Sequence, residues 1–287
     1  MTQTVAVVTD SAASLPPELA RKWGVRVVPM QVIVGGEAHA EGDDITPEQV
    51  LAHLVIGETV TTSQPNAAAF EREFAAAERE GAGAIVAVLI SSQLSGTVSV
   101  AQAAAGSVGI PVHVVDSATV AMATGYAALA AAALAATGAD ALSVAEAARS
   151  VARSSLCMFT VDDLDHLRKG GRIGPAVAAV GRVLGVRPLL TVTDGAVAMH
   201  ERVRTTERSR AALVEHARRA ILACERPGVA VMALGAAKYA TAAMDTLRNE
   251  CPQLVFAVAT PVSAVLAAHA GPGALAIVVA DLPEQFA

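Results

Sequence analysis

Hydroxyl side chains are concentrated in one short stretch, Ser91–Thr97 (S-S-Q-L-S-G-T), which follows the apolar run Ala84–Ile90. The run is short, continuous and bounded by glycine and serine, which predicts a buried β-strand. A helix is expected to begin near Ser95–Gly96, and the unpaired N–H groups of a helix N-terminus attract carboxylates and phosphates. Glycine lets a ligand oxygen approach the backbone, and hydroxyls add O–H donors. The stretch therefore fits an anion site, and a serine that merely caps a helix explains it equally well.

Two other predicted strands also end in Asp-Ser pairs. Val5–Thr9 runs into Asp10 and Ser11, and Val112–Asp116 is followed by Ser117. Parallel strands bring their carboxyl ends to one edge of a sheet, where α/β proteins collect ligands, so the three polar turns are expected to share a crevice. Asp10 and Asp116 also suit a metal site or a general base, although Asp-Ser after a strand is usually turn chemistry.

Hydrophobic periodicity, caps and turn residues place the other elements. In the first half, strands are expected at 25–30 and 31–34, a polar loop at 61–66, and helices at 17–23, 47–57, 67–80, 120–136 and 143–153. In the second half, strands are expected at 157–161, 187–192, 196–204, 229–234, 254–258 and 274–280, and helices at 163–168, 175–184, 206–224, 238–249 and 263–270. Thr193-Asp194-Gly195 is a strong hairpin signal between two of these strands.

The change of pattern divides the chain into two expected domains. Strands alternate with helices in residues 1–158, which predicts a parallel sheet covered on both faces. A hairpin and later strand–helix units in residues 159–287 predict a mixed α/β domain. The fold class is therefore α/β.

Composition excludes several classes of function. The net charge of −6 disfavours a general nucleic-acid binder. The 3 cysteines lack C-x-x-C spacing, which argues against a disulfide framework or a zinc site and fits a reduced cytoplasm. Neither a membrane span nor a signal peptide is predicted, so we expect a cytoplasmic protein without stable membrane insertion. The sequence has no G-x-S-x-G elbow, Walker loop, H-E-x-x-H or kinase signature, so nothing in it predicts ATP binding.

Seven short motifs, in this order, resemble the DegV family, the fatty-acid-binding proteins that serve bacterial fatty acid kinase. They are T-D-S at Thr9–Ser11, T-T-S-Q-P-N at Thr61–Asn66, S-S-Q-L-S-G-T at Ser91–Thr97, V-D-S at Val115–Ser117, L-R-K-G-G-R-I at Leu167–Ile173, R-V-R at Arg202–Arg204 and H-A-G-P-G at His269–Gly273. Gln93 stands where the family usually has glycine, and Asn66 where it usually has serine.

The resemblance implies a three-layer N-terminal domain and a two-layer C-terminal domain, with an acyl chain in an apolar tunnel at the interdomain cleft. Carried over by motif, the carboxylate contacts are Thr62, Ser95, Gly96 and His269. Ser63, Asp10, Ser11, Ser92 and Arg172 are weaker candidates. Arg202 and Arg204 resemble the contact surface for a DAK-like, ATP-binding fatty acid kinase. The resemblance implies neither a catalytic residue, a metal nor a cofactor other than the bound fatty acid.

Each of these residues also has a purely structural explanation. Thr62 fits a helix cap, and His269 fits a charge complement to a helix end. Arg202 and Arg204 alternate along a predicted strand and fit a solvated edge.

The expected function is that of a carrier. The chain would bind a long-chain fatty acid and present its carboxylate to a separate kinase, which would make an acyl phosphate for phospholipid synthesis. Two alternatives stay open: a Ser/His acyl-ester hydrolase that uses Ser95 and His269, and a lipid or anionic-metabolite sensor without a kinase partner.

Overall fold

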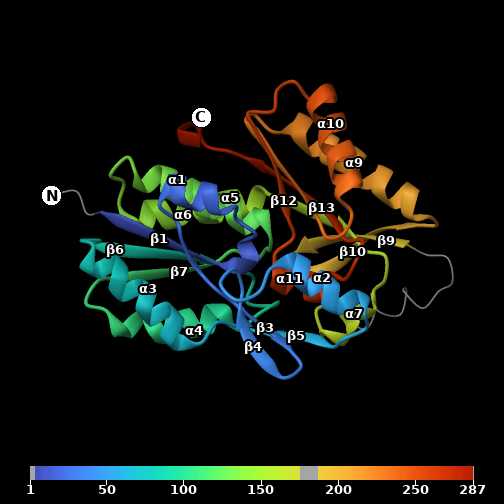
Figure 1. The fold of residues 1–287 in the computed structure, drawn as a ribbon. Helices are drawn as coiled ribbons and strands as arrows, with labels where there is room; N and C mark the ends of the chain where they lie inside the picture. Colours follow the sequence, from blue (N-terminus) through green and yellow to red (C-terminus); the bar gives the residue numbers. More distant parts are fainter. Residues whose placement is uncertain (1–3, 175–186, 287) are drawn as a thin grey trace.

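The computed structural model describes residues 4–174 and 187–286 (Figure 1). Its first sheet has four parallel strands in the order β2–β1–β6–β7. These are β1 (Val5–Asp10), β2 (Arg26–Val28), β6 (Ala84–Leu89) and β7 (Val112–Asp116). Every residue of β6 is buried, as the continuous apolar run predicts for a central strand covered on both faces.

Helices cover both faces of this sheet. On one face lie α5 (Met122–Ala135) and α6 (Ala141–Ser154), with α1 (Pro17–Trp23) against α5. On the other face lie α3 (Ala67–Arg79) and α4 (Thr97–Ala104). The alanine-rich α5 also packs against the second sheet, so nearly all of it is buried. The predicted three-layer domain is confirmed.

A small antiparallel sheet in the order β4–β3–β5 lies beside this domain. It contains β3 (Gln31–Val34), β4 (Glu37–Ala40) and β5 (Val60–Ser63). The prediction of a loop at 61–66 is therefore wrong for its first three residues. β-branched threonines suit a strand, and β5 pairs with β3. Between β4 and β5, α2 (Pro47–Val55) begins with the predicted capping box of Thr46 and Gln49.

The second sheet is mixed and has the order β10–β9–β8–β13–β11–β12. Its strands are β8 (Leu156–Thr160), β9 (Arg187–Thr193), β10 (Ala196–Val203), β11 (Pro227–Ala233), β12 (Phe256–Pro261) and β13 (Leu275–Asp281). α9 (Thr206–Ala223) and α10 (Ala237–Glu250) cover one face, and the other face meets α5 and α6 (Figure 1). This is the two-layer arrangement that the resemblance implies.

The expected domain division falls inside an element. β8 begins at Leu156 and pairs with β9 and β13, so a boundary between residues 158 and 159 cuts a strand of the second sheet. Two short helices complete this half: α7 (Asp165–Lys169) and α11 (Ala264–Ala270). The helix expected at 175–184 lies outside the described residues.

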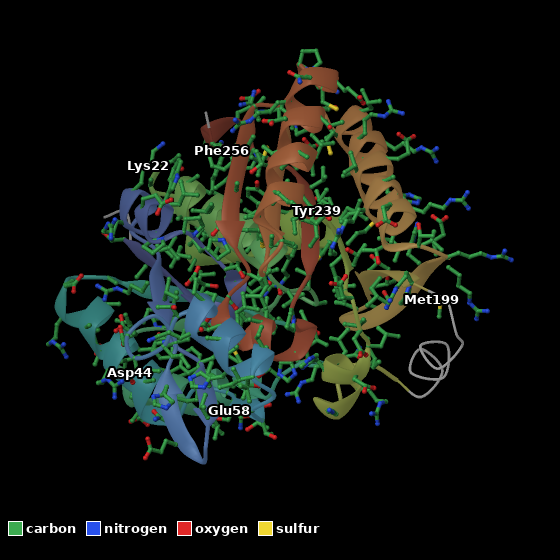
Figure 2. All side chains as sticks on the ribbon, turned by 45° about the vertical axis from the view of Figure 1, so that its right-hand side comes forward. Lys22, Asp44, Glu58, Met199, Tyr239 and Phe256 are labelled. Carbon is green, nitrogen blue, oxygen red and sulfur yellow. The ribbon has the colours of Figure 1, made fainter. Side chains whose placement is uncertain are left out.

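One hydrophobic cluster runs through both halves of the chain, joining α5 and α6 to buried residues of β11 and β13. Aromatic rings extend it to the C-terminus, where Phe286 stacks on Trp23 with ring centroids 5.3 Å apart. Phe286 also meets Phe256 (labelled in Figure 2) at 5.2 Å, and Phe256 meets Tyr126 at 6.2 Å. Among the described helices, none combines the length and apolar character needed to cross a bilayer.

Candidate functional site

A cavity lies between the two sheets and has an empty volume of about 870 Å³, counting the space open at its mouth. Most of its lining is aliphatic and comes from both halves of the chain. The apolar lining includes Ala12, Met30, Ile90, Leu94, Val120, Ala121, Cys157, Phe159, Leu167, Val197, Met232, Val262, Val265, Leu266, Ala270, Ala274 and Ala276. Such a lining suits an aliphatic ligand.

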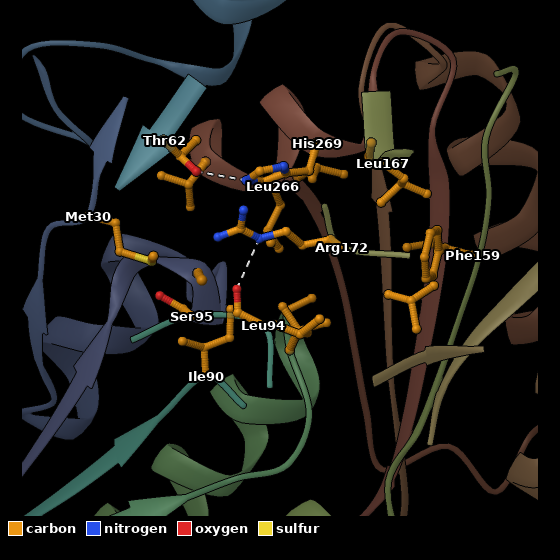
Figure 3. A pocket seen from close by; sticks show the side chains of 18 of the residues that line it. Met30, Thr62, Ile90, Leu94, Ser95, Phe159, Leu167, Arg172, Leu266 and His269 are labelled. Atoms are coloured by element: carbon orange, nitrogen blue, oxygen red, sulfur yellow. Dashed lines mark hydrogen bonds between the residues drawn. The ribbon is translucent and has the colours of Figure 1, made fainter. Parts of the chain in front are cut away.

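Polar side chains from four segments face this cavity (Figure 3). Thr62 on β5 is hydrogen-bonded to His269 near the end of α11, with 2.7 Å between Oγ1 and Nε2. Ser95 lies in the turn before α4, and its hydroxyl is 2.8 Å from that of Thr97. Arg172 enters from the loop after α7, and its Nε donates to the Leu94 carbonyl at 3.1 Å. Three of the four proposed carboxylate contacts, Thr62, Ser95 and His269, thus meet in one cavity.

His269 is uncharged in this setting. Burial, together with the neighbouring Arg172 charge, lowers the pKa of its imidazole to about 4. At neutral pH the ring therefore carries one N–H and one acceptor nitrogen. Hydroxyls, one imidazole N–H and one guanidinium together form a donor set that suits a carboxylate.

Glycines in two motifs let the chain around His269 pack closely against α7 and the residues on either side of it. A Cβ at Gly170 would lie 2.2 Å from His269 Nδ1. A Cβ at Gly271 would lie 2.4 Å from the His166 ring, and one at Gly273 would lie 2.0 Å from Asp162 Oδ2. The last two glycines also have positive φ angles of 74° and 79°. Gly170 of L-R-K-G-G-R-I therefore packs against His269 of H-A-G-P-G, and the glycines of H-A-G-P-G pack against the residues that precede L-R-K-G-G-R-I.

The other candidates divide between the cavity and its surroundings. Ser63 and Arg172 line the cavity. Gly96 is the N-cap of α4 with an ordinary φ of −72°, and it packs beneath the side chain of Gln64. Ser92 is exposed, and its N–H donates to Asp116. Of the residues described, Gly96, Ser92, Asp10 and Ser11 are outside the cavity lining.

Asp10 ties together two strand ends. Its carboxylate accepts from the N–H groups of Ala12 and Ile90, at 3.0 and 2.8 Å. Complete burial raises its pKa to about 7. The predicted sharing of one sheet edge is correct, since Asp10 and Asp116 both bond to the segment after β6. Within the described residues, no group of three or more His, Cys, Asp or Glu side chains could hold a metal ion.

Sequence reasoning missed Glu41, a buried carboxylate beneath the site. Glu41 accepts hydrogen bonds from the Ser11 hydroxyl and from the N–H groups of Ala264 and Val265 in the first turn of α11. Burial raises its pKa to about 7. This carboxylate therefore anchors the helix that carries His269. Its single-letter context, A-E-G-D-D, resembles an ordinary acidic turn, so only the three-dimensional contact identifies it.

The structure also tests two of the purely structural explanations, that Thr62 caps a helix and that Arg202 and Arg204 lie along a strand. Asn66, not Thr62, caps α3, because its side chain accepts from Ala69 N at 2.9 Å. A serine at this position would fill the same role, which explains the departure from the family motif. Arg202 is exposed on the edge strand β10, whereas Arg204 lies one residue beyond it, so the prediction that both are strand residues is wrong for Arg204.

The described chain does not show the geometry of a serine hydrolase. Ser95 is paired with Thr97, and the Nε2 of His269 is paired with Thr62. A triad requires the histidine to bond the nucleophile and a third group to orient the ring. Among the described contacts, neither bond is present.

Comparison with known proteins agrees with this geometry. The family model described as "Uncharacterised protein, DegV family" matches residues 4–282. A DegV domain-containing protein of Streptomyces coelicolor is 39% identical over 98% of this chain and 100% of its own. A fatty-acid-binding DegV family protein from Thermus thermophilus superimposes with a TM-score of 0.90 at 30% identity, covering 98% of this chain and 100% of its own. DegV of Bacillus subtilis, described as a fatty acid binding protein, gives 0.89 at 28%, covering 97% and 99%. The chain belongs to the DegV family.

Proposed function

We propose that this protein binds a long-chain fatty acid, with its acyl chain in the interdomain cavity and its carboxylate at the Thr62, Ser95 and His269 cluster. The observation that carries the proposal is an aliphatic cavity with its hydrogen-bond donors grouped together. The fatty-acid-binding descriptions of the Thermus thermophilus and Bacillus subtilis proteins support it.

The physical chemistry of the cavity suits such a ligand. Each buried methylene contributes about 0.8 kcal/mol, so an acyl chain supplies most of the binding free energy. The contacts to the carboxylate then need to contribute only a modest binding free energy. They must also allow the headgroup to leave after a chemical change such as phosphorylation. Neutral donors suit this requirement, and so does the single guanidinium of Arg172, which is already hydrogen-bonded to backbone carbonyls.

We further propose that the bound carboxylate is presented to a separate ATP-dependent kinase, and that this chain is the carrier in an acyl phosphate reaction. Exposed Arg202 and Arg204 suit a surface near a transferred phosphate, since arginine is always charged and binds phosphate in a bidentate manner. The α9 N-terminus follows them, beside a polar hollow lined by Arg187, Arg210 and Lys238 together with Asp162 and Glu207. In this hollow the Arg210 guanidinium lies over the ring of Tyr239 (labelled in Figure 2), with 3.6 Å between its Cζ and the ring centroid, and this contact restrains the guanidinium.

Mass spectrometry of an organic extract from the denatured, purified protein tests the ligand. We expect a near-stoichiometric fatty acid. An empty extract, together with failure to bind added fatty acids, would refute the carrier proposal. Labelling of Ser95 by a serine-reactive phosphonate would support the hydrolase alternative instead.

A reconstituted reaction with a bacterial fatty acid kinase and labelled ATP tests the partnership. Arg202→Glu with Arg204→Glu should reduce acyl phosphate formation at least about tenfold, because two favourable charges become repulsive. Fatty acid affinity should stay unchanged, as should the reaction with Arg72→Glu, an exposed charge on α3. Unchanged turnover in the double variant would favour a sensor without a kinase partner.

A further inference from the structure

The turn that carries Ser95 is hydrogen-bonded to the tip of the β9–β10 hairpin. The Ser91 hydroxyl donates to the Gly195 carbonyl at 2.7 Å, and the Gln93 side-chain Nε2 donates to the Asp194 carbonyl, also at 2.7 Å. The Gln93 N–H in turn donates to Ser91 Oγ at 3.2 Å. The two segments are about a hundred residues apart in sequence and belong to different sheets.

The hairpin presents these two carbonyls because of its turn type. Asp194 and Gly195 are its two central residues, and both have positive φ angles, 50° and 84°. They lie between the ends of β9 and β10, so their carbonyls are outside the strand ladder and free to accept other donors. A Cβ at Gly195 would lie 2.6 Å from Ser91 Oγ, so only glycine allows the hairpin to approach this closely.

The two hydrogen bonds are made by residues next to the cavity wall, outside the cavity lining. Leu94 and Ser95, which follow Gln93, line the cavity, as does Val197 at the start of β10. Gln93, Asp194 and Gly195 are not among the described lining residues. Ser91 is fully buried, whereas Gln93 is exposed, so the glutamine bond is the outer of the two.

We propose that Gln93 is a positioning residue of the binding site: by holding the Ser91–Ser95 turn against the β9–β10 hairpin, it sets the rate at which the ligand enters and leaves. The inference rests on the proposed function, since it requires a ligand in the interdomain cavity. The cavity is lined by residues from both halves of the chain, so a motion that separates the Ser91–Ser95 turn from the β9–β10 hairpin would widen the passage for an acyl chain. The bond from Gln93 opposes that separation and adds no contact to the ligand.

This device is particular to chains with a side-chain donor at this position. Glycine, which the DegV motif usually has here, has no side chain with which to donate the second bond. We therefore expect Gln93→Gly and Gln93→Ala to exchange fatty acid about three- to tenfold faster than the wild type, the effect of one exposed hydrogen bond. Gln93→Lys, which keeps a donor, should exchange at about the wild-type rate.

Stopped-flow fluorescence with a fluorescent fatty acid measures both association and displacement by excess unlabelled fatty acid. Both rates should rise by the same factor in Gln93→Ala, leaving the equilibrium Kd within about twofold. Gln102→Ala, an exposed glutamine on α4, is the matched control. Gly195→Ala disturbs both bonds and should accelerate exchange further; a thermal melt of each variant confirms folding.

Two results would overturn the inference. One is an unchanged exchange rate in Gln93→Ala; the other is a weaker Kd that comes from dissociation alone, which would mean that Gln93 stabilises only the bound form. Failure of the proposed function has a different signature, because the wild type would then bind no fatty acid at all.

Discussion

Replacing Glu41 by glutamine should change how the stability of this protein depends on pH. Burial raises the pKa of this carboxyl from 4.5 to about 7, so the folded protein holds the proton more tightly than the unfolded chain does. The contribution of Glu41 to the free energy of unfolding is therefore fully present below about pH 4.5 and is lost as the pH rises through about 7. From this pKa difference, the free energy of unfolding should fall by about 2 kcal/mol between about pH 5.5 and about pH 8.

Asp10 contributes a decline of the same sign and similar size, because its pKa is also raised to about 7 by burial. Between these two pH values, the free energy of unfolding should thus fall by about 4 kcal/mol in the wild type and by only about 2 kcal/mol in Glu41→Gln. Glutamine suits the site, since its amide oxygen can accept from the Ala264 and Val265 N–H groups while its NH₂ group donates to the Ser11 hydroxyl.

Urea unfolding at the two pH values, followed by the fluorescence of the single tryptophan, Trp23, gives both free energies. Glu37→Gln, an exposed residue of β4, is the matched control and should follow the wild type. Parallel pH profiles for Glu41→Gln and the wild type would refute the reasoning, because they would mean that Glu41 has the same pKa in the folded and unfolded chains.

Three further changes test the site. Thr62→Val should weaken fatty acid binding about five- to twentyfold in a fluorescence displacement assay, because it removes a hydroxyl at the head site, whereas Thr61→Val, its exposed neighbour on β5, should not. Gly170→Ala should weaken binding at least as much, since its Cβ would meet the His269 ring; equal affinity would contradict the packing described here. Ala121 lies on the cavity wall with φ 59° and ψ −151°, so Ala121→Gly should raise the free energy of unfolding by about 1 kcal/mol, and a loss of stability would show that no strain is stored there.

Short-range signals predict much of this fold. The apolar run of β6 and the capping box at Thr46 identify their elements because the causes lie within a few residues. Asp194-Gly195 likewise identifies the turn between β9 and β10. β5 was not predicted because three of its four residues, V-T-T-S, are polar and because it is held by pairing with β3, a partner that the local sequence does not reveal.

The same distinction separates the site residues. Thr62, Ser95 and His269 were predicted from motifs, and the structure brings them to one cavity. Asp10 and Ser11 belong to an equally clear motif, yet their bonds support strand ends and Glu41 instead of a ligand. Residue type shows that a side chain can donate or accept; whether it faces the cavity depends on packing between segments far apart in the chain.

The stacking of Phe286 on Trp23 ties the last residues of the chain to its first helix. During synthesis, α1 is made early, whereas Phe286 is made only after the strands of both large sheets. The surface of Trp23 that Phe286 covers therefore stays open to water and to chaperones while those strands are being made. A stop codon after Leu282 would leave that surface permanently uncovered.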